Sequence, residues 1–409
     1  MVNSRSRRLS MTDPTSLIQE ALPALIDLRH ELHQHPELKY EEHWTAARVV
    51  QALEDVPDLD INQGVARTGV VATLGADKPG PCLALRADMD ALPISEETGA
   101  PYASLTEGKM HACGHDGHTT CLVGAVRVLG QLADQLEGPV KFLFQPAEEG
   151  GAGGQLMCQE GVLDDPPVQA IFGLHGWPYL ELGQVGLRSG SLFASSDSFE
   201  IVVEGQGAHA AWPHQSVDPV LIAAHITTAL QSVVSRSTDP LDSVVVTVAQ
   251  IHAGTAFNII PSRARLNGTL RALNPVTRQR SMDTIERLVD NTAQAFGGSA
   301  QINFLDGYPV LVNDETALGY VKDTAAAVQA DGRTIPPAMG GEDFAFFAQR
   351  VPAAFFTLGL RGPEQASYPA LHQPDFDFAD AAIPLGVHMH VELARRFARH
   401  WRGNSATGR

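Results

Sequence analysis

Short apolar runs alternate with amphipathic helical patterns along most of this chain. Outside its middle segment, runs of strand length cover residues 69–74, 81–86, 140–144, 169–174 and 355–359, with another around Ile61. The helical patterns there cover residues 15–35, 41–53, 119–136, 317–330 and 379–401. Strands that alternate with helices form a mainly parallel sheet sandwiched by helices. The pattern therefore predicts an α/β fold, which places its chemistry at the carboxyl ends of the strands.

The middle segment, residues 190–307, follows another order. Its strand patterns cover residues 199–204, 243–251, 265–271 and 300–304. Its helical patterns cover residues 217–235 and 275–296, so the order is βαββαβ, as in a ferredoxin-like unit. We therefore expect a discontinuous catalytic domain of residues 1–189 and 308–409, interrupted by an inserted domain of residues 190–307.

Five side chains that bind transition metals stand where these apolar runs stop or where helices begin. They are Cys113, His115, Glu149, His175 and His372. Thiolate, imidazole and carboxylate groups are ligands for a borderline ion such as zinc, or for nickel, cobalt or manganese. The positions of these residues at the ends of strands and helices therefore predict one transition-metal site.

The run Met110-His-Ala-Cys-Gly-His-Asp-Gly-His118 carries two of these residues. Cys113 and His115 are two positions apart, so an extended backbone points both side chains the same way. The helix expected behind them favours a thiolate through its dipole. A single histidine in such a run is more often a surface or helix-cap residue, whereas three histidines and a cysteine within eight residues favour a metal site. His111 and His118 are either ligands or residues that orient a ligand by hydrogen bonds.

Carboxylates supply further candidate residues. Glu148 and Glu149 follow a buried strand pattern, and two adjacent carboxylates can divide the work, one on the metal and one taking a proton from the attacking water. As an isolated dipeptide this pair would be a weak signal. Asp88 and Asp90 end another apolar run, where acids are costly unless they are paired or near a cation. The alternative for these two aspartates is a solvated turn before Pro93.

Seven motifs follow one another over nearly the whole chain. They are Arg29-His-Glu-Leu-His-Gln-His-Pro-Glu37, Arg86-Ala-Asp-Met-Asp-Ala-Leu-Pro93, His111-Ala-Cys-Gly-His-Asp-Gly-His118, Gln145-Pro-Ala-Glu-Glu-Gly150, Gly207-Ala-His-Ala-Ala-Trp-Pro-His214, Gly254-Thr-Ala-Phe-Asn-Ile-Ile-Pro261 and Gly340-Gly-Glu-Asp-Phe344. In this order the chain resembles the N-acyl-amino-acid amidohydrolases. These are the branch of aminoacylase- and carboxypeptidase-like dinuclear metallopeptidases that includes hippurate hydrolases and auxin-conjugate hydrolases. The resemblance implies a zinc-peptidase-like catalytic domain, with the inserted segment as a lid and dimerisation domain.

The resemblance also implies roles for the residues of the predicted site. It implies two divalent transition-metal ions per subunit (zinc, manganese, cobalt or nickel), held by Cys113, His115, Glu149, His175 and His372. It further implies that Glu148 is the general base and that Asp90 orients a ligand. In carboxypeptidase-like relatives a histidine stands where this chain has Asp88, and acids stand near Cys113 and His175. The bridging ligand and the native metal therefore stay open, and the thiolate of Cys113 is our candidate for the bridge.

For the inserted domain, the resemblance implies a part in substrate binding. His209 is similar to a histidine that reaches the active site of the partner subunit and polarises the scissile carbonyl. A homodimer or larger homo-oligomer is therefore expected. From the residues alone, His209 would be a surface histidine in a loop after a strand. Asn258 and Arg271 match positions near the amide and the carboxylate of the substrate.

Together these features predict a metal-dependent amidohydrolase that acts on linear amides. The expected reaction is hydrolysis of N-acyl amino acids, with an N-acetyl, N-benzoyl or similar acyl group, to a free amino acid and a carboxylate. A dipeptidase or an N-acetyl-diaminopimelate deacetylase on the same scaffold is the close alternative. The alternative of another class is a non-catalytic metal-binding protein, against which the intact Glu148 and the complete ligand set argue.

The composition restricts the partners and the compartment. With 29 Lys and Arg against 47 Asp and Glu, the net charge is −18, which argues against nucleic acid or an anionic membrane as a partner. No apolar run is long enough to span a bilayer. The four cysteines show no paired framework, and the basic residues 1–10 are followed by no apolar core of a signal peptide. We therefore expect a cytoplasmic protein.

Overall fold

An eight-stranded mixed sheet forms the centre of the first of two units in the computed structural model, which describes residues 13–407. Within these residues, unit 1 comprises 13–187, 313–335 and 347–407, and unit 2 comprises 188–312 and 336–346. The expectation of a missing signal peptide concerns residues 1–10, which lie outside the described residues. The α/β class with a mainly parallel central sheet is confirmed, while the catalytic and dimerisation roles of the two domains remain predictions.

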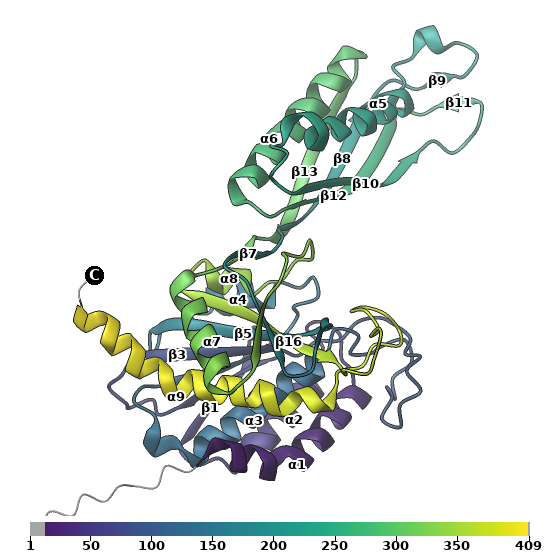
Figure 1. Cartoon of the computed structure of the whole chain (residues 1–409). Coiled ribbons are helices and arrows are strands. Elements are labelled where there is room, and N and C mark those ends of the chain that lie inside the picture. Colours follow the sequence, from purple (N-terminus) through teal and green to yellow (C-terminus); the bar gives the residue numbers. More distant parts are fainter. Residues whose placement is uncertain (1–12, 408–409) are drawn as a thin grey trace, which may run out of the picture. The chain divides into compact units, whose positions relative to one another are not determined.

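The strands of unit 1 lie in the order β1-β2-β4-β3-β5-β16-β6-β15, of which β1, β3, β5 and β16 are labelled in Figure 1. In that order they cover Leu59–Val65, Gly69–Leu74, Val140–Gln145, Cys82–Asp88, Val168–Glu181, Ala353–Arg361, Gln184–Leu187 and Asp331–Thr334. The central strands β4, β3, β5 and β16 are parallel, with Leu85 of β3 opposite Phe142 and Phe172. Every residue of β2, β3 and β4 is buried, as expected for strands that are covered on both faces.

Helices cover this sheet. They are α1 (Pro14–Gln34), α2 (His43–Leu53), α3 (His115–Gln131), α4 (Gly153–Gln159), α7 (Glu315–Ala327) and α9 (Ile383–Thr407). A short helix α8 (Ala345–Ala348) spans the last boundary between the units along the chain. Helices α1, α3 and α9 pack against one another. The approach is close at Gly124 of α3, where a Cβ would lie 2.6 Å from Val387. Among residues 13–407, no helix has the length and the apolar composition needed to cross a membrane.

The carboxyl ends of β3 and β4 lie level with each other. Asp88, the last residue of β3, pairs in register with Gln145, the last residue of β4. The polar residues that follow the two strands therefore meet at one edge of the sheet, where an α/β fold carries its chemistry.

Unit 2 has the βαββαβ order that the sequence predicts. Its main elements are β8 (Ser196–Glu204), α5 (Pro219–Ser232), β10 (Val244–Ala253), β12 (Arg263–Ala272), α6 (Pro275–Ala295) and β13 (Ser299–Tyr308), with short strands β7 (Gly190–Phe193), β9 (Ala208–His209), β11 (Ile259–Ile260) and β14 (Leu311–Asn313). The antiparallel sheet order β10-β12-β8-β13 is that of a ferredoxin-like fold. Both helices begin with proline after a side-chain cap, because Asp218 and Asn274 accept N–H groups of the first turn.

Two elements near the expected metal ligands differ from the prediction. Helix α3 begins at His115 rather than at residue 119, because Gly114 takes the left-handed conformation, with φ of 84°, as its N-cap. The expectation of an extended backbone from Cys113 to His115 was therefore wrong, since this turn separates the two residues. Strand β5 does not end at His175 but continues to Glu181, because β16 pairs with it that far.

Candidate metal centre

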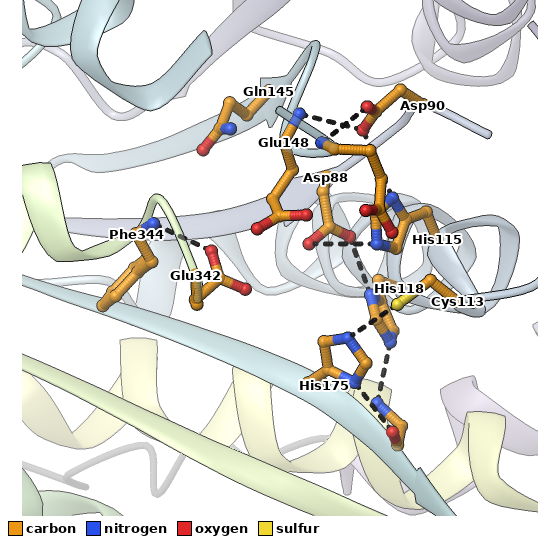
Figure 2. A network of polar contacts seen from close by, with 12 residues as sticks. Asp88, Asp90, Cys113, His115, His118, Gln145, Glu148, His175, Glu342 and Phe344 are labelled. Carbon is orange, nitrogen blue, oxygen red and sulfur yellow. Dashed lines mark hydrogen bonds and ion pairs between the residues drawn. The ribbon is translucent and has the colours of Figure 1, made fainter. Parts of the chain in front are cut away.

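The five expected metal ligands all belong to unit 1 and converge near the carboxyl ends of β3 and β4. Figure 2 shows three of them, Cys113, His115 and His175. Cys113 and His115 stand at the N-terminus of α3, and Glu149 follows β4. His175 lies within β5. His372 lies in the connection between β16 and α9, residues 362–382, which we call the His372 loop.

Two triplets of these side chains share the thiol of Cys113. In the first, Cys113 meets His115 and His175; in the second, it meets Glu149 and His372, and within each triplet the ligand atoms lie within 4.8 Å of one another. The Sγ of Cys113 is 3.4 Å from Nε2 of His175. The Nε2 of His372 is 3.1 Å from Oε1 of Glu149. The geometry therefore offers two neighbouring positions for an ion, with one thiol between them.

The ring of His175 is oriented for this role by its own backbone. Its Nδ1 lies 2.7 Å from the carbonyl oxygen of Gly176, which can only accept, so Nδ1 carries the proton and Nε2 presents its lone pair to Cys113. Burial, and then the neighbouring His118, lower the pKa of His175 well below its usual value. A neutral imidazole is the form that binds a metal.

His118 and His111 are both buried, but their contacts differ. The backbone N–H of Gly176 donates to Nε2 of His118 at 2.7 Å, and Nδ1 of His118 is 2.7 Å from Oδ1 of Asp88. Both ring nitrogens of His118 are thus occupied, although its ring lies close enough to Asp88 and His115 to be grouped with them as a metal triplet. The ring of His111 is buried, and neither of its nitrogens is hydrogen-bonded to a described residue. His118 therefore supports Asp88 and Gly176, while His111 orients no ligand by a hydrogen bond.

The carboxylate of Asp90 contacts three parts of the centre. Its Oδ1 and Oδ2 accept the backbone N–H groups of Glu148 and Glu149 at 3.0 and 2.9 Å. Its Oδ1 also lies 3.3 Å from Nδ1 of His115. Asp90 is fully buried, so these contacts compensate for its desolvation. This geometry fits a residue that orients a ligand.

Asp88 is buried and forms an ion pair with Arg86. It therefore does not lie in the solvated turn that the sequence left as an alternative. Its Oδ2 lies 2.7 Å from Nη1 of Arg86, and Nε of Arg86 donates to Oε1 of Gln145 at 2.8 Å. Although burial opposes ionisation, His115, Arg86 and His118 hold the pKa of Asp88 well below its usual value. The sequence did carry a signal for Arg86, namely a charged residue inside an apolar run.

Glu42 is a supporting residue that sequence reasoning missed. Its carboxylate accepts hydrogen bonds from the hydroxyl of Thr68 at 2.5 Å and from the backbone N–H of Ala147 at 2.8 Å. Ala147 has a φ of 56°, and this bond holds the turn that presents Glu148 and Glu149. The partners of Glu42 lie in distant parts of the sequence, so local patterns contain no signal for it.

The electrostatics of the centre favour a cation. Burial, followed by the charges of Glu149 and Glu148, raises the pKa of the Cys113 thiol well above its usual value. In the chain without metal, desolvation and these two carboxylates therefore oppose the thiolate that the dipole of α3 favours. Burial also disfavours the His115 imidazolium, yet Asp88 and Asp90 raise the pKa of His115 to about 10.

The residues present fit a divalent transition ion. Nδ1 of the buried His115 ring lies 3.3 Å from Asp90, whereas Nε2 comes no closer than 3.8 Å to its acidic neighbour Asp88, so Nε2 is the ring nitrogen that suits a metal. A thiol, three imidazoles and a carboxylate are ligands that zinc, manganese, cobalt or nickel accept. A divalent cation would also replace the protons that Cys113 and His115 otherwise hold.

The residues expected to bind substrate from the inserted domain lie in unit 2. His209 ends β9 and is exposed, and it pairs in register with Ile259, next to Asn258. The carbonyl oxygen of Asn258 accepts the N–H of Ala210 at 3.0 Å. The structure thus brings His209 and Asn258 together. Arg271 is half-buried near the opposite end of β12, and it makes no ion pair with a described residue.

Known proteins are similar to this chain in both sequence and fold. Peptidase family M20/M25/M40 matches residues 84–396, which include every candidate residue from Asp88 to His372. The chain is 39% identical over 372 residues to the N-acetylcysteine deacetylase of Bacillus subtilis (strain 168), covering 90% of this chain and 96% of that protein. It is 38% identical over 379 residues to an IAA-amino acid hydrolase of Arabidopsis thaliana, covering 91% of this chain and 85% of that protein. A crystal structure of a dinuclear metal-binding peptidase of the M20 family from Bacillus subtilis aligns with a TM-score of 0.81 and 34% identity, covering 93% of this chain and 99% of that one.

Proposed function

Because the chain belongs to peptidase family M20/M25/M40 and is a metal-dependent amidohydrolase, we propose that it hydrolyses the amide bond of N-acyl amino acids. The products are a free amino acid and the carboxylate of the acyl group. The relatives described above are named for N-acetylcysteine and for IAA-amino acids, which supports a conjugated amino acid as the substrate class.

The observation that carries this proposal is the position of Glu148. Its carboxylate lies within 4.8 Å of ligand atoms of His115 and Glu149, and its backbone N–H is held by Asp90. A carboxylate beside a metal centre, in addition to the ligands, is what general base catalysis of hydrolysis requires. In our proposal Glu148 takes the proton of the attacking water and later gives it to the leaving amine.

The two triplets define the proposed ligands of two divalent ions. Cys113, His115 and His175 would hold one ion, and Cys113, Glu149 and His372 the other, so Cys113 is the proposed bridge. When bound, such ions polarise the scissile carbonyl and lower the pKa of water. The metal is zinc, manganese, cobalt or nickel, as the ligand types favour.

Unit 2 supplies the proposed substrate contacts. Arg271 is a half-buried guanidinium without an ion pair to a described residue, which suits binding of the substrate carboxylate. Asn258 lies beside His209, so both can address the same part of a substrate, the amide. In this proposal His209 donates a hydrogen bond to the oxyanion that forms at the scissile carbonyl.

We propose further that His209 acts in the partner subunit of a homodimer or larger oligomer. Strand β10 is an edge of the four-stranded sheet, and Val245 and Ile251 on it are exposed. An open edge with exposed apolar residues is a surface that pairs with another chain.

The proposed compartment is the cytoplasm. All four cysteines lie among the described residues and are free thiols, which suits a reducing environment. The proposed Cys113 ligand also requires a reduced thiol.

Hydrolysis of a substrate panel tests the function. Metal-free enzyme and enzyme resupplied with Zn²⁺, Mn²⁺, Co²⁺ or Ni²⁺ would be assayed on N-acetyl-, N-benzoyl- and indole-acyl amino acids, dipeptides and N-acetyl-diaminopimelate. We expect metal-dependent release of free amino acids from one or more N-acyl amino acids. Cleavage of dipeptides alone would identify a dipeptidase, and cleavage of N-acetyl-diaminopimelate alone would identify that deacetylase. No cleavage of any of these substrates with any ion would contradict the proposed function.

A further inference from the structure

Arg29, in the first of the seven sequence motifs, is buried and has no part in the proposed reaction. Its side chain is 0% exposed. Its Nη1 lies 2.6 Å from Oδ1 of Asp377, and its Nε lies 2.7 Å from Oδ1 of Asp380. A third carboxylate, that of Asp116, lies 3.4 Å from Nη1. A buried cation with three carboxylates is costly to desolvate and need not stabilise a fold, so its presence calls for another explanation.

Tyr102 and His33 extend this group. Cζ of Arg29 lies 4.4 Å from the ring centroid of Tyr102, and the Tyr102 hydroxyl donates to Oδ2 of Asp377 at 2.7 Å. Nδ1 of His33 lies 2.9 Å from Oδ2 of Asp116. We call these six residues the Arg29 cluster: Arg29, His33, Tyr102, Asp116, Asp377 and Asp380.

The Arg29 cluster joins two chain segments that carry candidate ligands. Asp116 directly follows His115 in the first turn of α3. Asp377 belongs to the His372 loop, and Asp380 begins the last turn of that loop. Arg29 contacts all three aspartates from α1, so it ties the His372 loop to the N-terminus of α3.

Aromatic packing holds the same loop against the centre. Phe378 is fully buried, and a Cβ at Gly117, Gly176 or Gly114 would lie 2.3, 2.9 or 3.1 Å from its ring. These glycines adjoin or lie near the candidate ligands in the sequence. The ring fills a space that only glycines leave open, so this packing helps to hold the loop in place.

His372 itself has few contacts that fix it. Its backbone N–H donates to the carbonyl oxygen of Ala112 at 2.8 Å, and its side chain is 51% exposed. Its φ is 64°, in the left-handed region that side-chain-bearing residues adopt only at a cost. Such a conformation persists where the surrounding structure imposes it. The position of His372 therefore depends on what holds the rest of its loop.

We propose that the Arg29 cluster positions His372 for metal binding by holding the His372 loop on the N-terminus of α3. The inference rests on the proposed function, because it takes Cys113, Glu149 and His372 as ligands of one ion. Arg29 and Tyr102 act through the loop and contact neither substrate nor reacting atoms. Loss of the cluster weakens the ion position that uses His372 more than the one that uses His115 and His175.

Binding of Co²⁺ to the metal-free protein tests this. Wild type, Tyr102→Phe and Asp377→Asn would be stripped with a chelator and titrated with Co²⁺, with d–d absorption reporting affinity and elemental analysis reporting stoichiometry. We expect both variants to bind one of the two ions about 10- to 100-fold more weakly than wild type, as for residues that orient ligands. Asp197→Asn is the matched control, because it removes a buried carboxylate paired with Arg278 in unit 2, and it should bind Co²⁺ as wild type does.

A second comparison separates positioning from a general effect on stability. In a His372→Ala background, Asp377→Asn should cause no further loss of Co²⁺ affinity, because the residue that it positions is already gone. A merely structural role predicts the same loss in both backgrounds. Tyr102→Phe removes a single hydroxyl group, so the comparison can be made with it if Asp377→Asn does not fold.

The outcomes distinguish this inference from the proposed function. Unchanged Co²⁺ affinity in both cluster variants, or an equal loss in the His372→Ala background, would overturn the positioning role alone. A wild-type protein that binds no Co²⁺ would overturn the proposed metal centre instead. The positioning role is supported if Tyr102→Phe and Asp377→Asn lower the Co²⁺ affinity of one ion position, and if Asp377→Asn causes no further loss of affinity in the His372→Ala background.

Discussion

The backbone N–H of Glu148 donates a hydrogen bond of 3.0 Å to Oδ1 of Asp90. The second oxygen of the same carboxylate accepts the N–H of Glu149 at 2.9 Å. One buried acid thus fixes the backbone of the proposed base and of a proposed ligand together, and it also approaches His115.

Asp90→Asn should therefore weaken metal binding about 10- to 100-fold. Asparagine has one acceptor oxygen, so it can accept only one of the two backbone N–H groups, and its NH₂ group, which is a donor, would point at the other. Competition with a chromogenic Zn²⁺ chelator measures the affinity. Asp60→Asn, an exposed aspartate of β1, removes the same charge and should have no effect. Equal affinities for Asp90→Asn and wild type would show that Asp90 orients nothing that the metal needs.

Substitution of the two adjacent glutamates should affect turnover and metal content differently. Glu148→Gln should retain bound metal but lose about 10²–10⁴ in turnover, because glutamine cannot take the proton of the attacking water. Glu149→Gln should lower the metal content as well, since it replaces a proposed ligand. Elemental analysis together with single-substrate kinetics separates the two. Each variant serves as the control of the other, and loss of metal from Glu148→Gln would reverse the assignment.

The pH dependence of stability should report the charge on His33. Burial opposes ionisation of this ring, but Asp116 and Glu96 raise its pKa to about 10, from an ordinary value of 6.5. The stabilisation from the charged ring is then complete below pH 6.5 and is lost as the pH rises to about 10. In that window the free energy of unfolding should fall by about 1.4 kcal/mol per pH unit on account of this group.

Urea unfolding of the metal-free protein at pH 7 and pH 9.5 measures this loss. His33→Gln should show a smaller decrease between the two pH values than wild type does. His43→Gln, an exposed histidine at the start of α2, is the matched control and should follow wild type. An unchanged decrease in His33→Gln would mean that the ring is neutral in the folded protein.

His209→Ala should lower turnover about 10²–10³-fold and leave the metal content unchanged, because it removes a proposed oxyanion donor. Mixing His209→Ala with Glu148→Gln subunits tests action in trans. In a mixed homodimer one site regains both groups, so equal mixing should restore about a quarter of wild-type activity. If activity does not recover although subunit exchange has been demonstrated, His209 acts in its own subunit's site or lies outside the reaction.

Two helical glycines should respond in opposite directions to alanine. A Cβ at Gly117 of α3 would lie 2.3 Å from the buried ring of Phe378, whereas a Cβ at Gly319 of α7 meets no atom within 4 Å. Gly117→Ala should therefore lower the free energy of unfolding by about 1–3 kcal/mol through overpacking. Gly319→Ala should raise it by about 0.5–1 kcal/mol, because alanine restricts the unfolded chain. Thermal and urea unfolding measure both, and a neutral Gly117→Ala would show that Phe378 can move.

The sequence predicted those elements of the fold whose periodicity is strong. The buried strand at Val140–Gln145 and the long helix at Pro275–Ala295 were found because their apolar patterns differ. Strand β15, Asp331–Thr334, was missed because all of its residues are exposed and only its pairing with β6 makes it a strand. The first turn of α3 was missed because its N-cap is Gly114, which gives no capping signal by side chain.

Only part of the candidate site could likewise be predicted from the sequence. Residue type, position at the ends of predicted elements and the family resemblance selected Cys113 and His372 as ligands, and the structure brings them into one triplet, although their binding of metal remains a prediction. The hydrogen bonds around them were beyond a sequence argument, because they join distant segments, as Glu42 does with Ala147. The raised pKa of the Cys113 thiol in the chain without metal was also beyond a sequence argument, since desolvation and carboxylates can be placed only in three dimensions.

The pairing of β5 with β16 has a consequence for the way the protein is made. Cys113 to His175 leave the ribosome before the continuous segment 188–312 of unit 2, and His372 leaves after it. About 170 residues, or roughly 10–30 seconds of translation, separate the end of β5 from the start of β16. During that interval the nascent chain exposes an unpaired edge of its central sheet and carries only part of its proposed ligand set. The protein therefore depends on β16 to pair with the exposed edge of β5, and on His372 to complete the proposed ligand set. Truncation before β16 should leave an aggregation-prone chain rather than a weakened enzyme.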